Sequence, residues 1–131
     1  MIDHISVFVT DMERSKAFYT QALAPLGITA IMDFGVVCGF GRGQKPELWI
    51  GRGPTSFQTA EQVAAPTPIH VALAARSRAE VDAFHAAALA AGGKDFGAPG
   101  VRAEYHPNYY GAFVLDPDGH NIEAVIHVPG A

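Results

Sequence analysis

The sequence predicts an α+β fold made of two tandem copies of one unit, a strand and a helix followed by three more strands. A constant shift along the chain aligns His4 with His70 and Phe18 with Phe84, which indicates an internal repeat. Each histidine lies in a short apolar strand, and each strand leads into a helix-capping pattern. A unit of roughly 60 residues is too short to bury its own apolar face, so the two copies are expected to pack together.

Composition is that of one globular domain. With 131 residues, 49% hydrophobic and 17% charged, the chain is large enough for a real core, and we expect a single domain over 1–131. Its modules cover about 1–52 and 68–131, joined by a linker containing Pro and Gly. The net charge of −4, with Lys and Arg scattered, argues against nucleic acid as a partner.

The single cysteine favours a reducing environment. Cys38 has no intramolecular partner and lies in an apolar run, so it is expected to be a buried, inert thiol. No signal peptide precedes the first strand, and no apolar run approaches the roughly 18 residues of a membrane span. These features predict a cytoplasmic protein that does not bind membranes.

In the first half, alternation predicts a strand over 2–9. The pattern Thr10-Asp11-Met12-Glu13 then indicates a capping box that opens a helix to about Ala24, where Pro25 and Gly27 end it. Further strands are expected at about 33–40 and 46–51. The stretch 52–67 is interpreted as the linker.

The second half repeats this order. A strand over 69–74 is followed by the capping pattern Ser77-Arg78-Ala79-Glu80, and the helix runs to about Ala91 before Gly92-Gly93. Strands are expected at about 110–116 and 121–128, with Asp116-Pro117-Asp118-Gly119 as the turn between them.

Alternation along the strands places four chemically active side chains on one kind of surface. Apolar neighbours turn toward the helices, so His4, Glu47, His70 and Glu123 are expected to project from the opposite faces of their sheets. Buried imidazoles and carboxylates need a partner. A divalent cation satisfies two His and one or two carboxylates, and this donor set suits Zn, Fe(II), Mn, Ni or Co.

These residues make the chain similar to the vicinal oxygen chelate superfamily of glyoxalase I, extradiol dioxygenases and the fosfomycin and bleomycin resistance proteins. The most specific stretches are His4 through Thr20 and Ala112 through Glu123. The resemblance implies paired βαβββ modules that form a cupped mixed sheet around a metal ion. It implies ligands at His4, His70 and Glu123, with Glu47 as the fourth ligand.

The resemblance implies a glyoxalase-like, metal-dependent enzyme acting on a small oxygenated substrate. The metal would act as a Lewis acid, and Glu47 or Glu123 would move the proton. One alternative is an Fe(II) dioxygenase, in which two His and Glu123 form a facial triad. Another is a non-catalytic binder of an aromatic drug or metabolite. The expected pocket walls are Phe8, Trp49, Phe113 and Tyr109.

Departures from the family pattern separate its branches. Glyoxalase I enzymes hold glutathione with an Arg and an Asn, and this chain has Phe8 and Gly51 at those places. Ring-cleaving dioxygenases carry a Tyr where this chain has Phe113, although His106 stands near the position of a histidine that in those enzymes lies beside the metal site without binding the metal. We therefore do not expect lactoylglutathione isomerisation, and no branch of the family matches this chain at every position.

The tract Tyr105-His106-Pro107-Asn108-Tyr109-Tyr110 has no counterpart in the first half. We expect it to overhang the metal, with His106 and Tyr110 as acid–base groups. Packing against a neighbouring subunit is the alternative. Of the remaining histidines, His120 and His85 are expected to be solvated, and His127 shares the face of Glu123.

A homodimer is the expected assembly. Each module has one polar-lined face that no helix of its own covers, and a second chain would close the strand edges. The sequence is compatible with four metal ligands from one chain or with a site shared by two chains.

Overall fold

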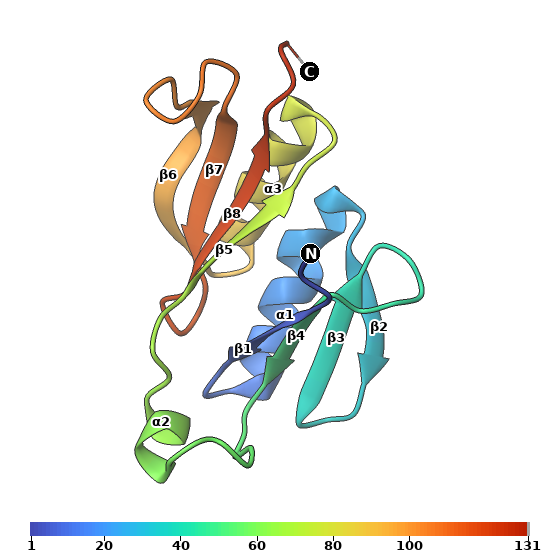
Figure 1. The fold of residues 1–131 in the computed structure, drawn as a ribbon, viewed down its shortest axis with the longest axis vertical. Helices are drawn as coiled ribbons and strands as arrows, with labels where there is room; N and C mark the ends of the chain where they lie inside the picture. The colour runs from blue at the N-terminus through green and yellow to red at the C-terminus, as the bar shows by residue number, and fades with distance from the viewer. Residues whose placement is uncertain (131) are drawn as a thin grey trace.

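The computed structural model describes residues 1–130 and contains two four-stranded mixed sheets with one long helix each (Figure 1). The first module consists of β1 (Ile5–Phe8), α1 (Met12–Leu23), a 3-10 turn (Ala24–Leu26), β2 (Thr29–Asp33), β3 (Val37–Gly41) and β4 (Leu48–Gly51). The short helix α2 (Ala60–Ala64) lies in the linker. The second module consists of β5 (His70–Ala74), α3 (Arg78–Ala90), β6 (Lys94–Val101), β7 (Tyr110–Leu115) and β8 (Asn121–Ile126).

The two sheets have the same topology. The strand order is β1-β4-β3-β2 in one and β5-β8-β7-β6 in the other, and in each sheet the first strand pairs in parallel with the last. The remaining pairs are antiparallel. This confirms the predicted α+β fold with two βαβββ modules.

Three elements differ from the prediction. The expected strand at 33–40 corresponds to β3, which begins only at Val37 because a turn around Gly35, with a φ of 85°, precedes it, and the prediction placed no strand where most of β2 lies. The alternation rule missed β6, since Gly97, Pro99 and Gly100 interrupt it and its pairing with β7 shifts register twice. The linker contains α2, which Thr59 and Gln62 cap reciprocally.

The helix caps agree with the sequence in part. Ser77 caps α3 as predicted, and its hydroxyl accepts from the backbone N–H of Glu80. Asp11 rather than Thr10 caps α1, with its carboxylate accepting from the backbone N–H of Arg14. Thr10 is free for a contact with the other module.

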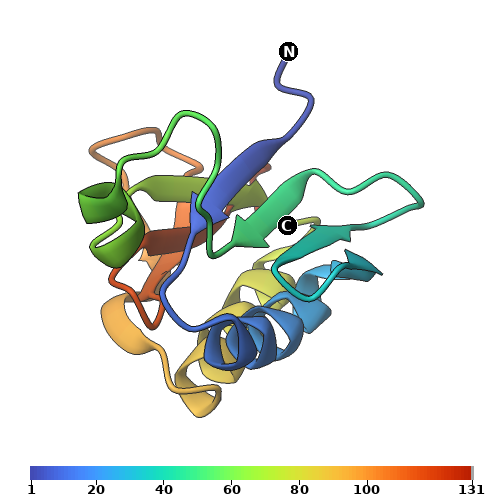
Figure 2. The same ribbon diagram turned by 90° about the horizontal axis from the view of Figure 1, so that it is seen from below.

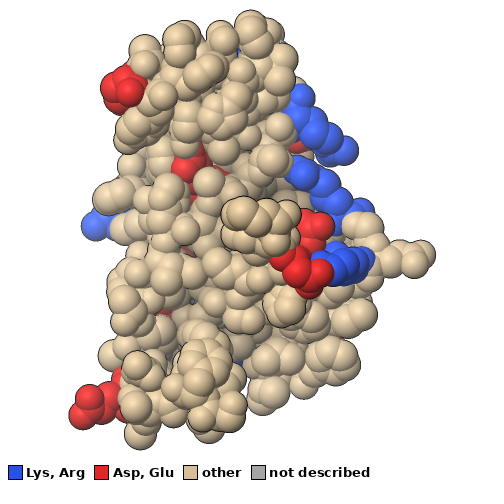
Figure 3. Space-filling model, viewed as in Figure 1, with Lys and Arg blue, Asp and Glu red and all other residues tan. Residues whose placement is uncertain are grey.

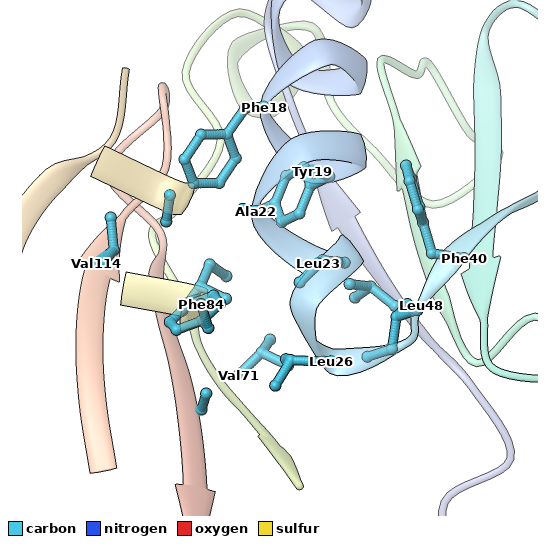
Figure 4. Close-up of a cluster of buried hydrophobic side chains, with 14 of the residues drawn as sticks. Phe18, Tyr19, Ala22, Leu23, Leu26, Phe40, Leu48, Val71, Phe84 and Val114 are labelled. Carbon is cyan, nitrogen blue, oxygen red and sulfur yellow. The ribbon is translucent and has the colours of Figure 1, made fainter. Parts of the chain in front are cut away.

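The core lies between the sheets and the two long helices. α1 and α3 lie side by side, on the same side of both sheets (Figure 2). Side chains from α1 meet Phe40 of β3 on one flank and Phe84 and Val114 of the second module on the other (Figure 4). Cys38 is fully buried here, as predicted. The modules therefore share one continuous core.

The turn between β7 and β8 joins the modules through polar contacts. Asp116 is buried, and its carboxylate accepts a hydrogen bond of 2.6 Å from the hydroxyl of Tyr19 on α1. Asp118 accepts from the hydroxyl and the backbone N–H of Thr10 at 2.6 and 3.1 Å. These bonds fix the start of α1 against the second sheet.

His120 completes this junction and is not solvated, contrary to the prediction. Its side chain is only 1% exposed. Nε2 donates to the carbonyl of Phe8 at 2.7 Å, and Nδ1 accepts from the N–H of Ile69 at 3.1 Å. One donor and one acceptor are the pattern of a neutral imidazole. The end of β1 is thereby held beside the start of β5.

Arg42 makes the corresponding contact at the other end of the modules. Its guanidinium donates to the carbonyl of Leu26 at 2.8 Å and to the carbonyl of Ala74 at the end of β5.

Within residues 1–130, no helix is both long and apolar enough to cross a membrane.

Replacing Asp116 with Ala is expected to destabilise the fold by about 2–4 kcal/mol, because it leaves the Tyr19 hydroxyl and two backbone N–H groups without their acceptor. The measurement is urea unfolding monitored by fluorescence. Asp118→Ala is the control and should cost about 1 kcal/mol, since its partners at Thr10 are exposed. Equal losses for the two variants would contradict the role given to Asp116.

Candidate functional site

The functional candidates lie on the sheet faces that the helices leave uncovered. Val7 and Ile50 are fully buried toward the helices, so the residues that alternate with them project to the opposite face. This confirms the predicted parity of the strands. Figure 3 views these faces, which carry few charged side chains apart from a cluster of acidic and basic residues at the level of the N-terminus.

One polar contact on this surface joins His70 to Glu123. His70 starts β5 and Glu123 lies in β8, and Nε2 of the histidine is 2.9 Å from Oε2 of the carboxylate. The Glu123 side chain is 1% exposed, whereas that of His70 is 50% exposed. A carboxylate at this depth needs such donors, because an unpaired buried charge costs several kcal/mol.

Tyr109 supplies the second donor. Its hydroxyl, from the loop before β7, donates to Oε1 of Glu123. Burial and this contact with the Glu123 carboxylate raise the pKa of the Tyr109 hydroxyl well above its usual value of 10.0. The phenol therefore stays protonated at neutral pH and holds one carboxylate oxygen while the other faces His70.

Gly111 makes room for this arrangement. A Cβ atom at Gly111 would lie 3.0 Å from Oε1 of Glu123 and 3.1 Å from the Tyr109 ring. Both contacts are tighter than nine in ten real Cβ contacts. The absence of a side chain in β7 thus sets how Glu123 and Tyr109 meet.

His4 and Glu47 lie together on the other sheet. Ile5 pairs with Leu48, and the N–H of Ile5 donates to the carbonyl of Glu47 at 2.9 Å. His4 and Glu47 therefore precede their strands side by side on one face. Both are exposed, and His4 Nδ1 is 2.7 Å from Asp3 Oδ1.

The strand register shows that Glu47 and Glu123 do not occupy equivalent positions in the two sheets. In the second sheet Ala72 pairs with Glu123, and in the first the equivalent Ser6 pairs with Trp49. Trp49 therefore occupies the position that corresponds to Glu123, and Glu47 stands two residues earlier.

The four candidate ligands consequently form two pairs. His70 and Glu123 belong to the second sheet, His4 and Glu47 to the first. Over the part of the chain that the structure describes, no three His, Cys, Asp or Glu side chains lie close enough to hold a metal ion.

The predicted pocket residues divide in the same way. Phe113 lies beside His70, with 6.1 Å between the ring centroids, and pairs with Glu123 across the strands. On the first sheet, Trp49 stacks on Phe34 at 6.4 Å with the rings nearly parallel. Phe8 meets Phe57 edge-on and borders a separate cavity of about 310 Å³ under the linker.

The tract at 105–110 reaches the site through Tyr109, which bonds Glu123, and through Tyr105, which lines the cavity beside His70. Tyr110 points to the helix side instead, where its hydroxyl donates to Asp82 at 2.7 Å. The prediction that Tyr110 is an acid–base group at the site is therefore wrong in this arrangement. His106 is exposed, and its ring packs edge-on against that of His127, with 5.8 Å between the ring centroids. The His127 ring in turn contacts the Tyr109 ring, with 4.8 Å between the centroids.

His85 lies outside this tract, and the prediction that it is exposed is wrong. Its side chain is only 13% exposed and forms a hydrogen bond with Asp95.

Sequence reasoning missed three residues of this site: Gly111, Arg102 and Asn121. Arg102 and Asn121 line, together with His70 and Phe113, a cavity of about 410 Å³. The Arg102 guanidinium lies over the Phe113 ring, 5.5 Å from its centroid. Parity places Asn121 on the face of Glu123, but no local pattern indicates the side chain of Arg102.

Comparisons with known proteins agree with this architecture. Residues 1–124 match the family described as the Glyoxalase/Bleomycin resistance protein/Dioxygenase superfamily, and the chain belongs to it. A glyoxalase/bleomycin resistance protein from Albidiferax ferrireducens T118 is 32% identical, with 94% of this chain and 96% of that chain covered and a TM-score of 0.77. No curated protein sequence matches.

Two more distant structures share the fold. Lactoylglutathione lyase from Agrobacterium tumefaciens is 19% identical, with 95% of this chain and 92% of that chain covered and a TM-score of 0.65. TioX from Micromonospora sp. ML1 is 16% identical, with 98% and 99% covered and a TM-score of 0.72. At these identities the likeness concerns the fold alone.

Replacing Glu123 with Gln is expected to lower the pKa of Tyr109 toward 10.0, because the charged acceptor is removed. Since the folded-state pKa of Tyr109 lies above the unfolded one, its stabilising contribution is complete below pH 10 and is lost as the pH rises further. Tyrosine ¹³C NMR titration measures the pKa, and denaturant unfolding at a series of pH values measures the stability. Tyr110 is the internal control, since Asp82 raises its pKa on the other face. An unchanged Tyr109 titration would contradict its contact with Glu123.

Proposed function

We propose that this protein is a glyoxalase-like, metal-dependent enzyme acting on a small oxygenated substrate. The observation that carries the proposal is the pair formed by His70 and Glu123, whose other carboxylate oxygen accepts a hydrogen bond from the Tyr109 hydroxyl. The divalent ion would be Zn, Ni, Co, Mn or Fe(II), all of which accept imidazole and carboxylate ligands.

The geometry of the pair fits a metal ion. Adjacent ligand atoms around a six-coordinate ion with bonds of about 2.1 Å are about 3 Å apart, and His70 Nε2 and Glu123 Oε2 are 2.9 Å apart. The hydrogen bond from Tyr109 orients the carboxylate from behind, as the outer partners of metal ligands do. His70 is half exposed, so its ring nitrogen is accessible to an ion.

Two ligands do not make a complete site, and a second chain is the source we propose for the rest. His4 and Glu47 lie on the uncovered face of the other sheet. In a two-fold symmetric homodimer, the first module of one chain would face the second module of its partner. Each site would then combine His70 and Glu123 of one chain with His4 of the partner subunit.

The chain's own groups support proton transfer at such a site. A bound ion supplies Lewis-acid polarisation of a carbonyl or an adjacent hydroxyl oxygen. Glu123 accepts protons at a carboxylate oxygen that Tyr109 has already oriented, and Glu47 beside His4 offers a second, exposed carboxylate. Phe113 provides an apolar ring beside His70.

The register at Trp49 favours a second candidate, an Fe(II) dioxygenase. Trp49 occupies the position equivalent to Glu123. The corresponding ligand positions of the two modules therefore provide two histidines, His4 and His70, and one carboxylate, Glu123. Such a facial triad leaves coordination positions for substrate and oxygen. Elemental analysis separates the candidates: Fe with oxygen uptake supports the dioxygenase, and Ni, Zn or Co supports the isomerase or lyase. A protein that holds no metal would instead be a binder of small molecules.

Replacing His70 with Ala is expected to weaken metal affinity at least tenfold, because one ligand is lost while the fold stays intact. Competition with a chelator measures the affinity. His85→Ala is the matched control, since His85 lies on α3 and bonds Asp95 at 3.0 Å, away from the site. Full metal occupancy of the His70 variant under mild chelation would overturn the site.

Mixing a His4→Ala chain with a His70→Ala chain tests the shared site. About half of the dimers formed from equal amounts are mixed, and each mixed dimer regains one of its two sites. Metal binding should therefore recover to about a quarter of the wild-type level. A site within one chain would show no recovery, and a monomeric mass with metal bound would equally exclude the shared arrangement.

Little turnover is expected with the hemithioacetal of methylglyoxal and glutathione, whichever metal is loaded. Phe8 and Gly51 offer neither a charge nor an amide for the glutathione carboxylates. The measurement is the standard absorbance assay for thioester formation. A kcat/KM within the range of efficient enzymes, about 10⁶ M⁻¹s⁻¹ or above, would overturn this expectation.

A further inference from the structure

Arg102 stands in an unusual position beside the His70–Glu123 pair. It lines the cavity of about 410 Å³ that also contains His70, Phe113 and Asn121. The wall of this cavity includes one permanent cation and no carboxylate. Among residues 1–130, Arg102 has no acidic side chain within ion-pair distance, and its guanidinium makes one hydrogen bond, from Nη2 to the carbonyl of Ala98 at 2.7 Å. Since a guanidinium has five N–H donors, most of them are available.

The backbone of β6 is shaped around this guanidinium. A Cβ atom at Gly97 would lie 3.3 Å from Nη2 of Arg102 and 2.8 Å from the Phe113 ring, and one at Gly100 would lie 3.1 Å from Nη1. The two glycines therefore let the guanidinium lie over the Phe113 ring. This contact restricts its rotation and reduces the conformational entropy that an arginine loses on binding an anion.

We propose that Arg102 is an oxyanion-binding residue and that the cavity beside His70 takes a small organic acid with a planar body. The carboxylate pairs with the free donors of Arg102, because a guanidinium matches the two oxygens of a carboxylate. The planar body contacts Phe113 and Phe96, whose side chain is 60% exposed at the cavity rim. A volume near 400 Å³ suits a ligand of this size.

This inference rests on the proposed function only in taking the His70–Glu123 pair as the reacting end of the cavity. In that setting Arg102 fixes the acid group of the substrate, while other substrate oxygens face His70. The binding of the acid group to Arg102 needs no metal. It can therefore be measured separately from metal-dependent activity.

The test compares benzoate with the uncharged benzamide on chelator-treated, metal-free protein, monitored by ¹H–¹⁵N NMR. Benzoate is expected to shift the amide signals of Gly97, Gly100 and Phe113 with a Kd tighter than about 1 mM. Benzamide should bind at least tenfold more weakly, because hydrogen bonds to a charged group are the stronger ones.

Arg102→Gln should remove the preference for benzoate, and Arg102→Lys should retain part of it as a point charge. Arg14→Gln, an exposed position on α1, is the matched control and should behave as wild type. Gly100→Ala keeps the arginine but crowds Nη1, so it should weaken benzoate more than benzamide. A role of Arg102 limited to its bond with Ala98 would lower stability without changing the ratio of the two affinities.

The outcomes separate this inference from the proposed function. Absence of benzoate binding, equal binding of benzoate and benzamide, or an unchanged preference in Arg102→Gln would overturn the role of Arg102. Failure of the protein to hold a metal would overturn the proposed chemistry and leave these binding results as they are.

Discussion

The structure depends on the polar junction between the β7–β8 turn and the first module. Asp116 accepts from Tyr19, and His120 bridges the carbonyl of Phe8 and the N–H of Ile69. Two modules joined only by an apolar core would be free to slide, since the hydrophobic effect has no direction. The directional bonds of this turn fix the register between the modules. They therefore also fix which strand ends meet, and so where each histidine stands.

A second constraint lies in the burial of Glu123. Its carboxylate is buried more deeply than any of the other candidate ligands, and both its oxygens are used, one by Tyr109 and one by His70. Tyr109 reaches it because Gly111 has no side chain. The His70–Glu123 pair is therefore pre-organised and does not have to form when a ligand binds. It is held by the loop at 105–110, by the glycine in β7 and by the position of His70 in β5.

Local periodicity was enough to predict the modules and the faces of their strands. Strand alternation placed His4, His70 and Glu123 on the uncovered faces, and the repeat established two equivalent modules. Features that depend on pairing across the chain were not predictable in this way. The offset between β1 and β4 puts Trp49, not Glu47, opposite Ser6. The choice of Tyr109 over Tyr110 depends on how the loop enters β7, and the burial of His120 exists only because a second module lies against it.

Asymmetry between the modules distinguishes the two halves of the site. The second sheet carries a buried carboxylate, a phenol and an arginine around His70, whereas the equivalent position to Glu123 on the first sheet is the indole of Trp49 stacked on Phe34. Duplication gives both faces the same backbone, but only one of the two equivalent positions carries a carboxylate. The first sheet therefore presents an aromatic ring where the second sheet presents a carboxylate. A site completed by the first module of a partner chain would thus combine a charged, hydrogen-bonding side with an aromatic one, which suits a planar acid better than a peptide such as glutathione.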